Sequence, residues 1–248
     1  MKVELPVTDR RTLLGLTAMT AGAAMVAVHG SAMAATADSN AAPAKLSMTP
    51  DQALARLIDG NRRFVADQNP VADISTKRRL EIAKSQAPFA VLVGCADSRV
   101  GPEHLFGGGL GELFIVRTAG NYVDDAGYGS IAYAIAALGT PLIVVLGHER
   151  CGAVDAATKL VTDNSQLPPS LTRMVQPILP AVIDARASLG TKTDLVDHAI
   201  HMNVRHVVRG LRETSDPIIA APLKAGKVKV VGAYYDLDTG AVDFFDRG

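Results

Sequence analysis

Residues 141–147 read Pro-Leu-Ile-Val-Val-Leu-Gly, an unbroken apolar run that ends at a glycine. Similar apolar runs occur at residues 89–94, 113–116 and 228–235. Runs of this length, in which polar and apolar residues do not alternate, are typical of parallel strands that are covered on both faces. The sequence therefore predicts a sheet whose strands are mostly parallel.

Helical segments separate these runs. Apolar residues recur at helical spacing over residues 50–66, and helices are also predicted at 130–138 and 194–212. Thr49 supplies a capping hydroxyl for the first helix, and Pro50 stands at its first position. Residues 241–245 follow a turn and are expected to return antiparallel along the sheet edge. The predicted fold class is α/β: a mostly parallel β-sheet with an antiparallel edge strand, flanked by helices.

The composition excludes several classes of protein. The chain of 248 residues has 25 Lys and Arg against 25 Asp and Glu, so it lacks the basic excess of a nucleic-acid-binding protein. Because 48% of its residues are hydrophobic and 20% are charged, it can form a full core. With aromatic residues at 4% and no tryptophan, an aromatic cage is not expected. Two cysteines are too few for a disulfide scaffold.

Residues 1–34 resemble a signal peptide. Arg10 and Arg11 precede a modestly apolar stretch at 13–28, and Ala32-Met33-Ala34 is a small-x-small cleavage site. The arginine pair indicates export by the twin-arginine pathway. An ordinary secretory signal and a retained membrane anchor are the alternatives.

The rest of the chain divides into two parts. Residues 35–46 are expected to form a flexible spacer, and residues 47–248 a single α/β domain that carries the site described below. After cleavage we expect a periplasmic or secreted protein with no stable membrane anchor.

The two cysteines stand where a parallel sheet binds its ligands, at the carboxyl ends of strands. Cys95 follows the apolar run at 89–94, and His148 and Cys151 follow the run at 141–147. Two thiolates and an imidazole form a zinc ligand set that leaves one tetrahedral position open. The sequence thus predicts one Zn²⁺ per chain.

Two other interpretations of the cysteines remain. An oxidising location would favour a Cys95–Cys151 disulfide, and buried thiols also occur as small apolar residues. Neither gives a role to His148.

Asp97 and Arg99 follow Cys95 closely and are the candidate catalytic residues. Asp97 either ligates the metal and closes the site, or is held by Arg99 in a bidentate pair and accepts a hydrogen bond from metal-bound water. An ordinary salt bridge is the third possibility. Zinc with two thiolates and a neutral imidazole has a net charge of zero. Because a less positive metal acidifies its bound water less, the activity is predicted to rise toward alkaline pH. Gly147 and Gly152 are expected to allow close packing around the ligands.

Two motifs carry a resemblance to a known family. Cys-Ala-Asp-Ser-Arg at 95–99 and His-Glu-Arg-Cys-Gly at 148–152 resemble the signature motifs of the β-class carbonic anhydrases. Further segments that are similar to the family, in the same order, lie at residues 60–64, 114–121, 130–134, 203–204 and 232–236. The resemblance covers about residues 48–246.

This resemblance implies a function and an assembly. Cys95, His148 and Cys151 would ligate zinc beside the Asp97–Arg99 dyad, and a zinc-bound hydroxide would interconvert carbon dioxide and bicarbonate. It also implies a homodimer or dimer of dimers, built partly by the helix at 50–66. The absence of tryptophan means that one subgroup's bicarbonate pocket does not carry over.

Two alternative functions stay open from the residues alone. The same metal chemistry acts on other small electrophiles such as carbon disulfide. The second alternative is a periplasmic zinc-binding or thiol-redox protein without enzymatic activity.

Overall fold

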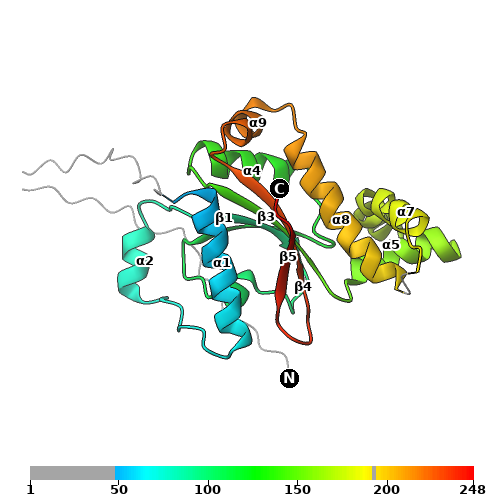
Figure 1. The fold of residues 1–248 in the computed structure, drawn as a ribbon, viewed down its shortest axis with the longest axis horizontal. Coiled ribbons are helices and arrows are strands. Elements are labelled where there is room, and N and C mark those ends of the chain that lie inside the picture. The colour runs from blue at the N-terminus through cyan, green and yellow to red at the C-terminus, as the bar shows by residue number, and fades with distance from the viewer. Residues whose placement is uncertain (1–47, 192–193) are drawn as a thin grey trace, which may run out of the picture. The chain divides into compact units, whose positions relative to one another are not determined.

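The computed structural model describes residues 48–191 and 194–248 (Figure 1). They contain one five-stranded sheet with the strand order β2-β1-β3-β4-β5. β2, β1, β3 and β4 are parallel to one another, and β5 is antiparallel to β4. The prediction of a mostly parallel sheet with an antiparallel edge is confirmed. The strands are β1 (Ala90–Cys95), β2 (Leu113–Thr118), β3 (Leu142–His148), β4 (Lys229–Tyr235) and β5 (Val242–Asp246).

Helices lie on both faces of the sheet and at its carboxyl end. Their bounds are α1 (Pro50–Val65), α2 (Thr76–Ile82), α3 (Pro102–Phe106), α4 (Asp125–Ala136), α5 (Gly152–Asp163), α6 (Pro169–Val175), the 3₁₀ turn η1 (Gln176–Ile178), α7 (Leu179–Ala187), α8 (Leu195–Arg212) and α9 (Pro217–Lys224).

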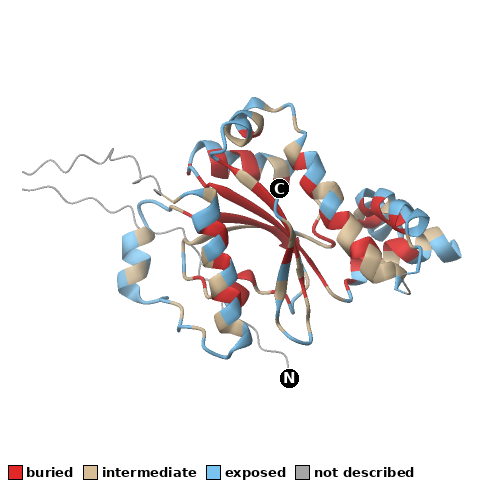
Figure 2. Cartoon of the chain, in the orientation of Figure 1, coloured by how far each residue is buried: buried red, intermediate tan, exposed pale blue. Residues whose placement is uncertain are grey.

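The core has three parts. Two of them lie on opposite faces of the sheet, because the side chains of a strand alternate between its two faces. On one face, α1 and α3 pack against residues such as Leu92 and Val144. On the other face, α4, α8 and α9 pack against residues such as Val93 and Val145. Figure 2 shows the central strands β1, β3 and β4 as a buried layer between these helices. The third part, at the carboxyl end of the sheet, is formed by α5, α6, η1, α7 and the first half of α8.

The predicted start of the first helix, at its capping residue Thr49, is confirmed. The Thr49 hydroxyl accepts the Gln52 N–H at the start of α1, and the Gln52 side chain accepts the Thr49 N–H in return. At the start of α8, the Asp194 side chain accepts the Asp197 N–H. Helix α4 begins five residues before the predicted start at 130, because Asp124 caps it by accepting the Gly127 N–H.

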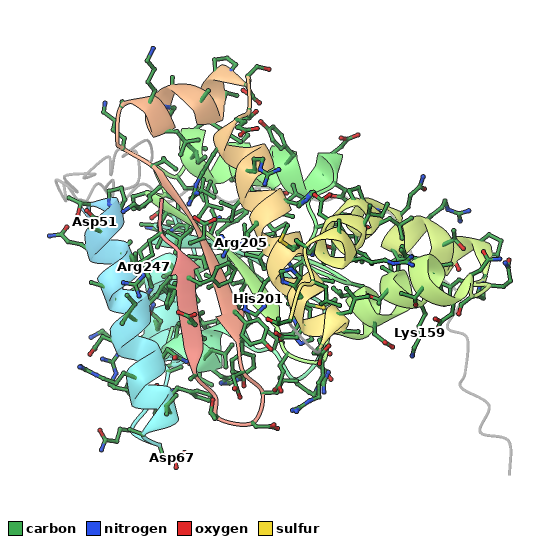
Figure 3. The ribbon with its side chains drawn as sticks, turned by 45° about the vertical axis from the view of Figure 1, so that its right-hand side comes forward. Asp51, Asp67, Lys159, His201, Arg205 and Arg247 are labelled. Carbon is green, nitrogen blue, oxygen red and sulfur yellow. The ribbon has the colours of Figure 1, made fainter. Side chains whose placement is uncertain are left out.

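Helix α8 is held against the sheet at its antiparallel edge. The His201 ring stacks on Tyr234 with centroids 4.4 Å apart. The Arg205 guanidinium lies 4.9 Å from the centre of the Phe245 ring. Figure 3 shows both α8 residues beside these strands. These contacts fix the helix that borders the site described below.

The predicted signal peptide at 1–34 and the spacer at 35–46 lie outside the described residues. Within residues 48–191 and 194–248, no helix is both long and apolar enough to cross a membrane.

Candidate metal centre

The sheet brings the three predicted zinc ligands together. Cys95 ends β1 and His148 ends β3, and these two strands are neighbours in the sheet. Cys151 stands one residue before α5, as its N-cap. All three residues are buried, and their ligand atoms lie within 4.8 Å of one another. The predicted cluster is confirmed.

The spacing and chemistry of the three side chains fit a zinc ion. The Cys95 and Cys151 sulfur atoms are 4.0 Å apart, close to the separation of about 3.8 Å that tetrahedral zinc with bonds of about 2.3 Å requires. His148 is fully buried, and its Nε2 has no hydrogen-bond partner among the described residues. Its Nδ1 lies 2.9 Å from the Glu149 carbonyl oxygen. A histidine whose Nδ1 is held this way presents Nε2 to a metal.

The sulfur atoms are not joined in a disulfide. The Cys151 thiol, as hydrogen-bond donor, lowers the pKa of the Cys95 thiol, and the same contact raises the pKa of Cys151. The pair thus loses its first proton readily and its second with difficulty. A bound cation favours loss of both protons, because metals are ligated by thiolates.

Asp97 and Arg99 form a bidentate pair, which is one of the three arrangements that the sequence left open. The Arg99 Nε donates to Asp97 Oδ1 at 3.0 Å, and Nη2 donates to Oδ2 at 2.7 Å. These bonds from the Arg99 side chain hold the Asp97 pKa well below its usual range. Oδ2 lies 3.9 Å from the His148 Nε2, so the carboxylate borders the ligand cluster. Ligation of zinc by Asp97, and the catalytic roles of Asp97 and Arg99, stay predictions.

The two glycines beside the ligands differ in their surroundings. A Cβ on Gly147 would lie 2.7 Å from the Val204 side chain, so the expected close packing is confirmed there. The expectation is wrong for Gly152, where a Cβ would meet no atom within 4 Å. Gly152 is exposed on the first turn of α5, whereas Gly147 lies in a central strand directly under α8.

Three residues near the site were not predicted as functional. Arg117 donates from Nε to the Cys95 carbonyl and from Nη2 to the Asp97 carbonyl, each at 2.7 Å. The Gly120 N–H donates directly to the Cys95 sulfur. Asn203 acts one step further away, because its side chain donates to the Gly120 carbonyl oxygen. A charged residue directly after the apolar run 113–116 was the available sequence signal for Arg117. For Asn203 the available signal was that residues 203–204 belong to the segments that resemble the family, but this did not place it beside Cys95.

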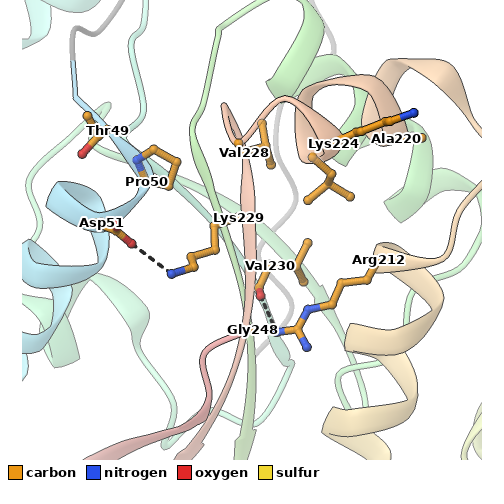
Figure 4. Close-up of a pocket in the computed structure, with 12 residues that line it drawn as sticks. Thr49, Pro50, Asp51, Arg212, Ala220, Lys224, Val228, Lys229, Val230 and Gly248 are labelled. Carbon is orange, nitrogen blue, oxygen red and sulfur yellow. Dashed lines mark hydrogen bonds and ion pairs between the residues drawn. The ribbon is translucent and has the colours of Figure 1, made fainter.

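Two cavities differ in their relation to the metal centre. One of about 450 Å³ lies beside it and includes Glu149, Arg150 and Gly152 in its lining. The other, of about 720 Å³, lies between the start of α1, α9 and the C-terminus, and its lining includes no residue next to a ligand in the chain (Figure 4). Two of the cations that line it, Lys229 and Arg212, are paired with Asp51 and Asp246. The functional site is therefore placed at the metal centre.

Comparisons with curated proteins agree with this geometry. A family model described as carbonic anhydrase matches residues 90–242. The carbonic anhydrase of Mycolicibacterium smegmatis is 41% identical over 195 residues, which are 78% of this chain and 92% of that protein. Carbonic anhydrase 2 of Mycobacterium tuberculosis is 41% identical over 194 residues, with 77% and 90% covered.

Solved structures show the same architecture. The β-carbonic anhydrase of Coccomyxa, in complex with acetazolamide, has a TM-score of 0.59 and 27% identity, with 77% of this chain and 86% of that chain covered. A structure from a study of two tetrameric β-carbonic anhydrases of Sordaria macrospora has a TM-score of 0.61 and 26% identity, with 67% and 84% covered. Taken with the Cys95-His148-Cys151 cluster, these matches establish that this chain belongs to the β-class carbonic anhydrase family.

Proposed function

We propose that this chain is an exported carbonic anhydrase in which Cys95, His148 and Cys151 hold zinc and Asp97 and Arg99 direct the reaction. The chain is a zinc-dependent carbonic anhydrase, which converts carbon dioxide and water into bicarbonate and a proton. One observation carries the proposed roles: three buried ligand atoms converge beside a carboxylate that a guanidinium holds.

When bound, zinc supplies the Lewis acidity that makes water a nucleophile near neutral pH. Arg99 bonds both carboxylate oxygens of Asp97, which keeps the carboxylate ionised and limits its motion toward His148. Oδ2 of Asp97 then accepts a hydrogen bond from the reacting water and orients it toward carbon dioxide. Because Asp97 is only partly buried, the water that it orients lies close to solvent, which takes the released proton.

The surroundings of the ligands suit a small apolar substrate. Cys95 and Cys151 belong to a cluster of buried apolar side chains that includes Ala153 and Val154. Such walls limit the access of bulk water and strengthen the electrostatic effect of the nearby charges.

The experiment measures zinc content and stopped-flow carbon dioxide hydration at pH 7.0 and 8.5. We expect about one zinc per chain and measurable hydration. Asp97→Ala should keep zinc and lose most hydration. Asp238→Ala is the matched control, because Asp238 pairs with Arg150 near the site but borders no ligand. Bound zinc without hydration at either pH would refute the activity, and an active Asp97→Ala variant would refute the role of Asp97.

Export by the twin-arginine pathway is part of the proposal. Its support is the sequence itself: Arg10-Arg11, the apolar stretch at 13–28 and the Ala-x-Ala site at 32–34. In a bacterial host we expect mature protein in the periplasm, beginning at residue 35. Replacing both arginines by lysine should retain the full chain in the cytoplasm. Periplasmic protein that still begins at Met1 would contradict cleavage.

A homodimer or dimer of dimers is also proposed. Several large apolar side chains of α1 and the segment that follows it are exposed in the single chain, namely Ile58, Val65, Val71, Ile74 and Leu80. A related structure is described as tetrameric. Light scattering coupled to size-exclusion chromatography should give a molar mass two or four times that of the chain. A molar mass equal to that of one chain at micromolar concentration would contradict this.

A further inference from the structure

The turn after β2 places a backbone N–H against a zinc ligand. The Gly120 N–H donates to the Cys95 sulfur, with nitrogen and sulfur 3.2 Å apart. Gly120 has a φ of +92°, and a Cβ at this position would lie 2.4 Å from Ile178 Cδ1. The backbone conformation and the lack of space both require glycine here. The turn is thus shaped to bring this N–H to the sulfur.

A side chain from a distant helix fixes the same turn. Asn203 of α8 is buried, with 1% of its surface exposed. Its Nδ2 donates to the Gly120 carbonyl oxygen at 2.8 Å. Asn203 itself has little freedom, because the next residue, Val204, fits against the strand glycines Gly147 and Gly232. Asn203 therefore connects a rigid part of the core to the turn that contacts Cys95.

We propose that Asn203 is a positioning residue of the metal centre, which holds the Gly120 carbonyl so that the Gly120 N–H stays on the Cys95 sulfur. The inference rests on the proposed function in one respect, that Cys95 ligates zinc. A hydrogen bond to a thiolate ligand fixes its orientation and moderates the charge that it donates to the metal. Loss of such an outer partner lowers metal affinity by about 10- to 100-fold.

The test replaces Asn203 by aspartate in the full chain. Asn203→Asp keeps the size of the side chain but replaces the donating amide by an oxygen that repels the Gly120 carbonyl. Zinc affinity is measured by competition with a chromophoric chelator, and the sulfur-to-metal charge-transfer band is recorded after Co²⁺ substitution. We expect zinc affinity about 10- to 100-fold weaker and a shifted cobalt band.

Asn61→Asp is the matched control. Asn61 is a second buried asparagine on a helix, and its Nδ2 donates to the Gly240 carbonyl oxygen at 2.9 Å. It belongs to α1, which packs on the opposite face of the sheet from α8. We expect Asn61→Asp to lower thermal stability while zinc affinity and the cobalt band stay unchanged. An equal loss of affinity in both variants would overturn the inference, as would wild-type affinity in Asn203→Asp.

A second pair of variants serves if Asn203→Asp does not fold. Asn203→Ser keeps a shorter hydrogen-bond donor, whereas Asn203→Ala has none. The serine variant should therefore bind zinc several-fold more tightly than the alanine variant. Equal affinities in this pair would overturn the inference. Wild-type protein that binds zinc through thiolates but does not hydrate carbon dioxide would refute the proposed function alone and leave the role of Asn203 intact.

Discussion

Replacing Arg99 by alanine should turn Asp97 from a neighbour of the metal into a ligand. In the structure, Asp97 Oδ2 is 3.9 Å from the His148 Nε2. Two ligand atoms of tetrahedral zinc, each about 2.0–2.1 Å from the metal, lie about 3.3 Å apart. A movement of about 0.6 Å is therefore enough to bring the carboxylate to a ligand position. The two bonds from Arg99 oppose that movement.

The strength of this restraint gives the size of the effect. Hydrogen bonds to charged groups contribute about 1.5–3 kcal/mol. Half of the Arg99 side chain is exposed, so solvent screens the pair and the restraint is weaker than that of a buried pair. Without Arg99, the equilibrium should shift several-fold toward the Asp97-ligated form. We expect hydration at pH 7 to fall by a similar factor while zinc content stays unchanged.

The assay follows hydration together with azide binding to the Co²⁺-substituted protein, since azide requires an open metal position. Both should weaken in Arg99→Ala, and azide binding should recover in the double variant Arg99→Ala/Asp97→Ala. Arg150→Ala removes an equal charge from an equally exposed arginine that pairs with Asp238, and it should change neither reading. Hydration within twofold of wild type in Arg99→Ala would refute the reasoning, and so would lost hydration with unaltered azide binding.

Three further outcomes are expected. Because a metal with two thiolate ligands acidifies water less than one with three imidazoles, hydration should be faster at pH 8.5 than at pH 7.0; equal rates would argue against the neutral donor set. Removal of zinc under oxidising conditions should join Cys95 and Cys151, which are already 4.0 Å apart, and thiol titration should then find no free thiol; zinc-loaded protein should keep both. Gly147→Ala should lower the free energy of unfolding by about 1–3 kcal/mol, since its Cβ would meet Val204, whereas Gly152→Ala, which meets nothing, should leave the thermal midpoint nearly unchanged.

Much of this protein follows from the order of its residues. The apolar runs at 89–94 and 141–147 predicted the buried strands because continuous hydrophobic stretches have few other ways to leave water. The ligand positions followed from the same runs, since parallel strands present their carboxyl ends at one edge. The capping residue Thr49 located the start of α1, because the unpaired N–H groups of a first turn need a local acceptor.

Other features depend on contacts between segments that are far apart in the chain. Helices α5, α6 and α7 were not predicted individually, because they are short and are stabilised by packing on one another and on α8. The need for glycine at Gly120 comes from Ile178, nearly sixty residues later, and the support from Asn203 comes from α8. The sequence alone determined which residues can bind zinc and where the sheet places them. Only the tertiary structure decided what surrounds the ligands, because hydrogen bonds and steric contacts to the Cys95 sulfur exist only after distant segments have packed together.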